Sequence, residues 1–548
     1  MKKNRAVIAS AVVVAVLLVT SVAAAQSDLN GSGWWSSANV QRTGDAAGSA
    51  EVVMTAYDKE GGTGDDYDCG SKVLPSFGSG ATFFPHVSGC VPDGFEGSAI
   101  LSASDEIAAI AQVLNIGYGG WAPGDTPYGR ALAAYAGVST PDTTVRFPLY
   151  KNDHVNEMTT FYVQNAGSSE TGLTAVFQPC SDQGDGTPCL GYADGPYTYD
   201  VLGLDANRMI IIDPTLAENG AGDPIPAGNG SYGSLVITSD SENIAAAVME
   251  HSQDAAPATY VKSVAGFSPD GYDNKYWIPQ IKDRYPAAVS DQPCNSKWSS
   301  LMVQNADTVQ VTVNVTYTVN ENPLDGTRVG TTFVDSATIE PDETAFFMTY
   351  QQPEFQEGDL ASAEVSATGD IVAMVNEEMR WECIDTDLKD LASWKGIPNN
   401  ATQRKLSAPF YKQEWQGKFQ GLVVQNVGQG SATFTVKITV IDSEISGVNA
   451  GDVFEFTHTD SKGPGEAKTF VMPCSDVPSN LTAITGDYHN LCDLTPGALK
   501  GTNVAVVVES TEPIVGVVTE EKGWWISASL VGDGHSEDAG MYTAVPLD

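Results

Sequence analysis

Alternation of apolar and polar residues with a period of two is the clearest pattern in this 548-residue chain. Residues 309–319 carry an apolar or aromatic side chain at every odd position, and residues 434–440 alternate in the same way. Successive residues of a strand point to opposite faces of a sheet, so the pattern predicts half-buried β-strands. The 54 glycines and 29 prolines predict many turns between them. We therefore expect an all-β fold.

Four related segments follow one another along the chain. A stretch ending in Val-Gln recurs at residues 33–44, 158–167, 297–307 and 419–428. A second stretch, an apolar run, an acidic turn and another apolar run, begins at Gly97, Gly233, Ala361 and Gly501. We interpret it as a β-hairpin and not a helix, because its fourth copy is Val-rich and contains Pro513. A glycine follows each copy, at Gly137, Gly266, Gly396 and Gly532.

A Pro-centred stretch comes next in each segment. It reads VRFPLYKND, KYWIPQIKD, KLSAPFYKQ and GMYTAVPLD, with its proline at Pro148, Pro279, Pro409 and Pro546. Intervals of 131, 130 and 137 residues between these prolines suit β-sandwiches of seven or more strands, not solenoid repeats. We expect four tandem Ig-like β-sandwich domains, at residues 26–144, 145–275, 276–405 and 406–540.

The N-terminus has the pattern of a secretory signal. Residues 1–25 combine a basic start, an apolar stretch at 6–22 and three alanines at 23–25. The apolar stretch is long, so a retained membrane anchor is the alternative. The net charge is −41, and removing Lys2, Lys3 and Arg5 makes it −44. Such a charge argues against nucleic acid and anionic lipid as partners. We expect a secreted protein, extracellular or on the cell surface.

Cysteine spacing agrees with the division of the chain into four segments. The eight cysteines fall two to a segment, as Cys69 and Cys90, Cys180 and Cys189, Cys294 and Cys383, Cys474 and Cys492. One disulfide per domain is the simplest interpretation for an exported chain. Eight cysteines permit 105 pairings, so this one follows from the repeats alone.

Three of the shared motifs resemble a known repeat. Residues 134–138 (AYAGV), 147–153 (FPLYKND) and 161–169 (FYVQNAGSS) are similar to a tandem, Ig-like β-sandwich repeat of secreted and surface proteins of bacteria. The resemblance covers essentially the whole mature chain. Its motifs are structural, so it implies an envelope or extracellular role and carries no enzymatic activity.

Spacing of the Pro-centred stretch suggests a spare strand. Pro148 precedes Val163, and Pro409 precedes Val424, by 15 residues, while counting back 15 from Val40 reaches Ala25, the expected cleavage site. If the stretch belongs to the domain that follows it, the first domain lacks a strand and residues 541–548 are left over. Donation of that strand into another copy would build a polymer. The alternative is that the stretch closes the domain before it, which leaves no spare strand.

The residues that this hypothesis assigns are few. The donor strand would be Tyr542, Thr543, Val545 and Leu547, and the acceptor groove would lie near Trp34, Trp35 and Val40.

Catalytic motifs are missing from the sequence. None of the six histidines has H-E-x-x-H spacing, and no G-x-S-x-G, P-loop or C-x-x-C motif occurs. We expect no enzyme. Calcium is the best cofactor candidate, at the oxygen-rich loops 64–68, 182–186 and 268–274, although Asx turns use the same residues. N-glycosylation sequons occur at Asn30, Asn229, Asn314, Asn400 and Asn480.

Three functions fit these observations. The first is a structural subunit of an extracellular filament or surface layer that polymerises head to tail with itself. The alternative is a monomeric cell-surface adhesin that binds surface glycans through its loops or tryptophans. An accessory domain array of a hydrolase complex is the third.

Overall fold

A computed structural model of the chain describes residues 12–15, 34–44, 46–116, 130–180, 195–252, 261–285, 297–379, 392–413, 418–443, 448–457, 461–471, 482–483, 501–522 and 540–547. The prediction of an all-β fold is confirmed, since these residues form antiparallel strands with a single short α-helix, α1 (Pro85–Ser88). Five 3-10 turns accompany them, η1 (Pro214–Leu216), η2 (Pro269–Gly271), η4 (Gly326–Arg328), η5 (Thr349–Gln351) and η7 (Asn399–Ala401). Within the described ranges, no helix has both the length and the apolarity to cross a membrane.

The strands form four similar sets, which we call repeats one to four. Each set has an outer sheet and an inner sheet. In repeat one the outer sheet has the order β1 (Val12–Ala15), β6 (Gly97–Ala103), β3 (Ala50–Asp58), β4 (Asp66–Leu74). Its inner sheet has the order β5 (Gly80–Phe83), β2 (Trp34–Arg42), β7 (Ile107–Ile116), β8 (Arg130–Ala136).

Repeat two follows the same plan. Its outer sheet has the order β9 (Thr144–His154), β14 (Tyr232–Ser239), β11 (Thr171–Pro179), β12 (Tyr197–Leu204). Its inner sheet has the order β13 (Met209–Ile212), β10 (Glu157–Asn165), β15 (Ile244–Ser252), β16 (Val261–Ala265), and a short pairing of β9 with β10 joins the two sheets.

In repeats three and four, one 21-residue strand serves both sheets. Repeat three consists of β17 (Asp273–Asp283), β18 (Lys297–Asn305), β19 (Val311–Glu321), β20 (Thr332–Ile339), β21 (Thr344–Met348), the long β22 (Asp359–Met379), β23 (Ala392–Lys395) and β24 (Ile397–Pro398). Repeat four consists of β25 (Gln403–Gln413), β26 (Lys418–Asn426), β27 (Phe434–Ser443), β28 (Val453–Thr457), β29 (Ala467–Val471), β30 (Thr482–Ala483), the long β31 (Thr502–Lys522), β32 (Gly540–Thr543) and β33 (Val545–Leu547).

The hairpin prediction for the stretches that begin at Gly97 and Gly233 is wrong. They are strands, as expected, but β6 pairs with β3 while β7 pairs with β2 and β8. The acidic turn therefore carries the chain from the outer sheet to the inner sheet. β14 and β15 are separated in the same way, and in β22 and β31 the chain crosses without leaving the strand. Apolar runs on both sides of the turn fit either arrangement, so the sequence pattern could not distinguish them.

Three of the four Pro-centred stretches pair with the repeat that follows them in sequence. β9 pairs with β14, β17 with β22 and β25 with β31. Pro148, Pro279 and Pro409 therefore each lie in the first strand of a repeat.

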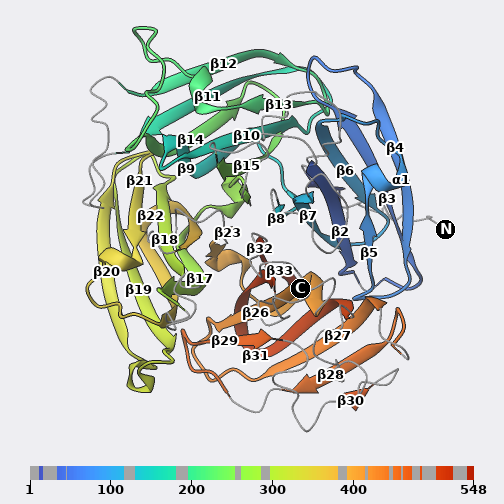
Figure 1. The fold of residues 1–548 in the computed structure, drawn as a ribbon, viewed down its shortest axis with the longest axis vertical. Helices are drawn as coiled ribbons and strands as arrows, with labels where there is room; N and C mark the ends of the chain where they lie inside the picture. The colour runs from blue at the N-terminus through green and yellow to red at the C-terminus, as the bar shows by residue number, and fades with distance from the viewer. Residues whose placement is uncertain are drawn as a thin grey trace, which may run out of the picture.

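The four repeats form a closed ring (Figure 1). The last strand of each inner sheet lies toward the middle of the ring, and these strands touch in cyclic order: β8 contacts β16 and β32, and β23 contacts the same two. Repeat four thus meets repeat one, so the ring is closed by a single chain.

Inner sheets are buried on both faces. In β10, Phe161 and Val163 belong to the core cluster of repeats two and three, while Tyr162 between them belongs to the cluster of repeat one. All nine residues of β15 are buried. One face fills the repeat's own sandwich and the other packs on the neighbour, as in other sheets covered on both sides.

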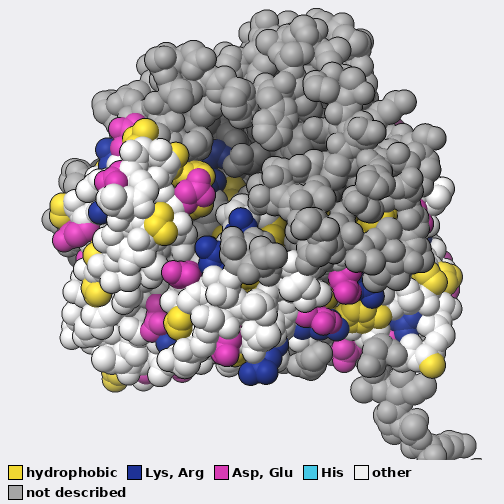
Figure 2. Space-filling view, turned by 90° about the horizontal axis from the view of Figure 1, so that it is seen from below, with side chains coloured by type: hydrophobic (Ala, Val, Ile, Leu, Met, Phe, Trp, Pro, Cys, Tyr) yellow, Lys and Arg dark blue, Asp and Glu magenta, His cyan; other side chains and the backbone are white. Residues whose placement is uncertain are grey.

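Acidic residues are spread over the surface. On the face shown in Figure 2, the Asp and Glu side chains lie scattered among Lys and Arg and form no single patch. The negative charge of the chain therefore does not mark one binding surface among the described residues of this face.

Candidate functional site: the seams between repeats

The proposed donor strand is not spare in this chain. β32 pairs with β31 through Tyr542 and Val518, and β33 pairs with β25 through Leu547 and Lys405. Tyr542 is 2% exposed, and its hydroxyl donates a hydrogen bond to the carbonyl of Phe410. The C-terminal residues are thus part of repeat four.

The donor prediction aligned Pro546 with the wrong proline of repeat three. β32 occupies the place of β23, since both lie at the middle of the ring, and β33 pairs with the first strand of its repeat as β24 does. Pro546 consequently corresponds to Pro398, not to Pro409. Ala544, not Gly532, stands at the position of Gly396, and Gly532 lies outside the described residues.

All three proposed acceptor residues lie on one inner strand, β2. Trp34 and Val40 are buried on β2, which is paired on both sides, with β5 and β7. Trp35 is half-buried, with its ring 4.9 Å from that of His86. The structure therefore places these residues in a paired inner strand, and the acceptor groove stays a prediction.

One of the predicted cysteine pairs is present among the described residues, since Cys69 and Cys90 form a disulfide. Cys180 is also disulfide-bonded, and its pairing with Cys189 stays a prediction. Cys189, Cys294, Cys383, Cys474 and Cys492 lie outside the described residues.

Other predicted sites remain predictions. Asn229, Asn314 and Asn400 are exposed, as glycosylation requires, whereas Asn30 and Asn480 lie outside the described residues. The loops 64–68 and 268–274 are described and the loop 182–186 is not. Neither described loop brings three acidic or histidine ligands together, since the group of that kind found within the described ranges lies elsewhere, at Glu157, Glu250 and Glu378.

A recurring hydrogen-bond unit joins successive repeats, and we call each such contact a seam. Gln304, at the end of β18, donates from Nε2 to the carbonyl of Asp342 over 3.1 Å. Ser234 of repeat two donates its hydroxyl to the same carbonyl over 2.5 Å. One carbonyl of repeat three therefore accepts from its own inner strand and from the preceding repeat.

The same unit occurs at two further seams. Gln164 and Ser98 share the carbonyl of Asn207, and Gln425 and Ser362 share that of Gly465. These Gln and Ser side chains are buried, where an unpaired polar group would cost about 1–3 kcal/mol. The glutamine of the shared Val-Gln motif thus has a structural role in each repeat.

The accepting residue has a left-handed backbone in every repeat. Its φ is 78° at Gly78, 63° at Asn207, 65° at Asp342 and 80° at Gly465. Gly, Asn and Asp are the residues that adopt this conformation most readily.

The fourth seam closes the ring with a variation. Gln41 donates to the carbonyl of Gly78 over 3.2 Å, as its equivalents do. Ala505 stands where the other repeats have the serine that crosses the seam, such as Ser234. Val506 pairs with the residue before Pro409, as Leu235 pairs with the residue before Pro148, so the residues preceding them correspond. Ser407 of repeat four instead donates to Oε1 of Gln41.

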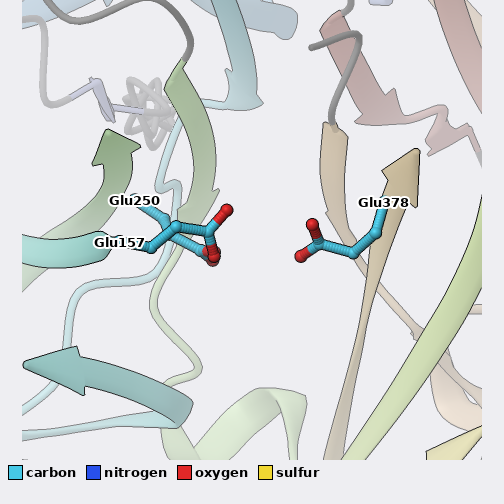
Figure 3. Close-up of side chains that lie close together, drawn as sticks. All are labelled: Glu157, Glu250 and Glu378. Atoms are coloured by element: carbon cyan, nitrogen blue, oxygen red, sulfur yellow. The ribbon is translucent and has the colours of Figure 1, made fainter. Parts of the chain in front are cut away.

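A buried group of charges lies at the seam between repeats two and three. Repeat two contributes Lys151, Glu157, Glu250 and Lys262, and repeat three contributes Glu378. Nζ of Lys262 is 2.5 Å from Glu250 and 2.7 Å from Glu378, so this lysine bridges the repeats. Figure 3 shows Glu378 pointing across toward the other two carboxylates.

A neighbouring amide links the same repeats. Asn376, on β22, donates from Nδ2 to Glu250 over 2.9 Å and accepts a hydrogen bond from the hydroxyl of Ser393. Glu250 therefore interacts with two lysines of its own repeat and with one amide of the next.

Electrostatics in this group keep both lysines protonated. Glu157, Glu250 and Glu378 hold the pKa of Lys151 well above its ordinary value although burial opposes this, and they raise the pKa of Lys262 similarly. Burial raises the pKa of the Glu250 carboxyl to about 7, although Lys151 and Lys262 oppose the shift. Two protonated lysines lack a lone pair for nucleophilic attack, and their side chains are 8% and 0% exposed. The group consequently suits a structural clamp and not a substrate site.

Sequence reasoning missed this group, although a signal was present. Lys151 and Lys282 each lie three residues after the proline of the first strand. Glu250 and Glu377 each lie six residues after an isoleucine of the inner strand, Ile244 or Ile371. In the structure Lys151 pairs with Glu250 at 2.6 Å, and Lys282 with Glu377 at 3.0 Å. A lysine and a glutamate recurring at fixed offsets in different strands indicate a pair.

Comparison with known proteins does not assign the chain. No protein-family model matches it, and no curated protein does. Among solved structures, the crystal structure of Thermotoga maritima 1070 is similar to a part of it. The identity is 11%, the match covers 23% of this chain and 95% of that one, and the TM-score is 0.18.

Proposed function

We propose that the protein is an exported, non-catalytic structural subunit of an extracellular filament or surface layer, with the four-repeat ring as its building block. One observation carries this proposal. The residues that the repeats share, such as Gln164 and Gln304, make the hydrogen bonds of the seams. Residues repeated four times thus support the shape of the ring, and none of them lines an open site among the described residues.

In our proposal, these rings associate through their outer surfaces and not by exchange of the C-terminal strand. Donation of Tyr542 to Leu547 to another copy would remove β32 from β31 and break the hydrogen bond from Tyr542 to Phe410. An outer edge strand such as β20 is paired on one side only among the described strands. Edge strands can pair with another copy without unfolding either ring.

Negative-stain imaging of the exported protein tests this function. We expect ring-shaped particles that associate into filaments or layers as concentration rises. Calcium and a chelator should be compared, because an acidic surface associates more readily when cations neutralise it. Isolated rings at every concentration, with and without calcium, would contradict the proposal.

A glycan-binding adhesin is the second candidate, and one pair of rings favours it. Trp298 and Tyr350 pack edge to face with centroids 4.8 Å apart, and Tyr350 is 48% exposed. Trp34, Trp277 and Trp394 are buried and unavailable. Glycan-array binding that Tyr350→Ala abolishes would support this function over the structural one.

A further inference from the structure

The loop before β14 contains an Asn-Gly pair, Asn229 and Gly230, of which the first is exposed and the second buried. Such a pair is prone to cyclise, because the second residue has no side chain to hinder the approach of its nitrogen to the side-chain carbonyl of the first. Two backbone hydrogen bonds fix the loop on β9, from Gly228 to Asn152 over 3.0 Å and from Asn152 to Ser231 over 2.9 Å.

The turn between β9 and β10 contacts both residues of this pair. The amide of Gly230 donates a hydrogen bond to Nδ1 of His154 over 2.9 Å. The amide of Val155 donates to Oδ1 of Asn229 over 3.0 Å. Two adjacent residues of one turn therefore hold the nitrogen and the carbonyl that would react with each other.

The turn that makes these contacts has an unusual backbone conformation. Its φ is 50° at Val155 and 62° at Asn156. Two-residue hairpin turns with positive φ favour Asn and Gly, and a β-branched residue is rare there. Strain of this kind persists where surrounding contacts determine the conformation, and it clusters at functional sites. The strained Val155 is the residue that presents its amide to Asn229.

The imidazole of His154 is unprotonated at neutral pH. Burial lowers the pKa of His154 to about 3, and the charge of Lys151 adds to the shift. Nδ1 therefore keeps the lone pair that accepts from Gly230, and the ring proton is on Nε2. A ring with so low a pKa is a weak base, but it returns a proton readily, as transfer to a leaving amine requires.

We propose that Asn229 is a self-modification site, at which the folded protein converts the asparagine to aspartate or isoaspartate through a cyclic imide. The Gly230 nitrogen gives its proton to Nδ1 of His154 and forms a bond to Cγ of Asn229. The Val155 amide stabilises the negative charge that develops on Oδ1.

The remaining steps use only this proton and water. The bond between Cγ and Nδ2 of Asn229 breaks, and Nδ2 leaves as ammonia with the proton that His154 returns. Solvent water then opens the imide ring at either of its carbonyls, which gives aspartate or isoaspartate. No electrons are transferred, and the exposed loop gains a negative charge.

A second Asn-Gly pair in the same loop provides a matched control. Asn219 is 8% exposed, and its Oδ1 accepts from the amides of Ala221 and Asp223 at 2.9 Å each. Among the described residues, the amide of Gly220 donates to no histidine. Folding should therefore protect Asn219 while it activates Asn229.

Peptide mapping by mass spectrometry tests the proposal on the full-length chain. The chain is produced without glycans, because a sugar on Nδ2 of Asn229 would block the loss of ammonia. We expect Asn229 to deamidate at least about tenfold faster in the folded chain than in the same chain unfolded in urea at the same pH. Asn219 should show the opposite order. An Asn229 rate that is equal or slower in the folded chain would overturn the proposal.

The variant His154→Phe tests the role of the histidine. Phenylalanine keeps a ring next to Tyr232, whose centroid is 4.6 Å from that of His154, but it cannot accept from Gly230. We expect deamidation of Asn229 to slow by about tenfold, less than the loss of a base of matched pKa would cause, while Asn219 is unchanged.

The opposite result has a clear meaning. If the two hydrogen bonds only fix the loop, His154→Phe would loosen it, and Asn229 would deamidate at the same rate or faster. Either outcome would refute a catalytic role for His154. If the variant does not fold, the comparison of the folded and unfolded parent chains still decides.

Discussion

Ser407 donates a hydrogen bond to Gln41, 366 residues earlier in the chain, and this contact joins the last repeat to the first. Gln41 also donates to Gly78, as its equivalents do to their own turns. The contact that closes the ring therefore uses the equivalent of the glutamines at the other seams, together with a serine from a different position in its repeat.

Removing this serine should weaken the closure. We expect Ser407→Ala to lower the free energy of unfolding by about 1–3 kcal/mol, because Oε1 of Gln41 loses its buried donor. Urea denaturation measures the change. Ser336→Ala, at an exposed serine of β20, should change stability by less than about 0.5 kcal/mol. Equal effects of both substitutions would contradict a specific role for the closing contact.

Replacing Tyr542 should destabilise the monomer. We expect Tyr542→Ala to cost about 3–5 kcal/mol, because the substitution leaves a cavity in repeat four and removes the hydrogen bond to Phe410. Thermal unfolding of the monomer provides the measurement, with Tyr350→Ala at a half-exposed tyrosine as the control. An unchanged Tm would mean that β32 is not seated in repeat four, and a donor role for the C-terminus would become attractive again.

Neutralising one lysine of the buried group should be costly. Lys262→Met would leave Glu157, Glu250 and Glu378 facing a single remaining lysine, so we expect a loss of about 3–5 kcal/mol. Glu364→Gln is the matched control, because its partner Lys275 is partly exposed and such pairs contribute about 1 kcal/mol or less. Chemical denaturation of both variants would show whether the two pairs differ, and similar losses would count against a buried clamp.

Glu250 should make stability depend on pH. Its folded pKa of about 7 is above the ordinary glutamate value, so the folded state binds the extra proton. The stabilisation is complete below about pH 4.3 and is lost as pH rises through 7. Glu250→Gln lacks this dependence, so its stability relative to the parent should increase between pH 5 and pH 8. Urea titrations at several pH values test this, and a constant difference would refute the assignment.

The disulfide of repeat one should contribute stability. It joins Cys69 and Cys90 across a separation of 21 residues, and closing a loop of that length contributes about 3 kcal/mol in the chain-entropy model. Replacing both cysteines with alanine should reduce the free energy of unfolding by about this amount. No change in the urea midpoint would show that the unfolded chain gains little freedom when the bond is absent.

Much of the fold was accessible from the sequence. The period of two in residues 309–319 predicts the strand β19, one face of which is buried and the other more exposed. The strand begins at Val311, and Val309 lies before it and is exposed. Pro513 led to the correct choice of strand for β7 and β15, where alanines suggested helix.

Other features depend on contacts between repeats, which local patterns do not encode. Gln164 and Gln304 lie in strands buried on both faces, where alternation disappears and a polar residue gives no sign of its partner. The donor strand was misassigned because Pro546 could be aligned with either Pro398 or Pro409. Only the pairing of β33 with β25 decides between these alignments.

The carbonyls of Asn207, Asp342 and Gly465 each receive donors from two repeats, and this has a consequence for the number of repeats. A shared acceptor fixes the angle at which one sandwich follows the next, and three such steps together with the contact of Ser407 with Gln41 complete a full circle. Loops far from these carbonyls are free to lengthen or to change their composition. A chain that gained or lost one repeat would instead form an arc whose ends do not meet. Geometry therefore constrains the number of repeats more tightly than it constrains the sequence of the loops.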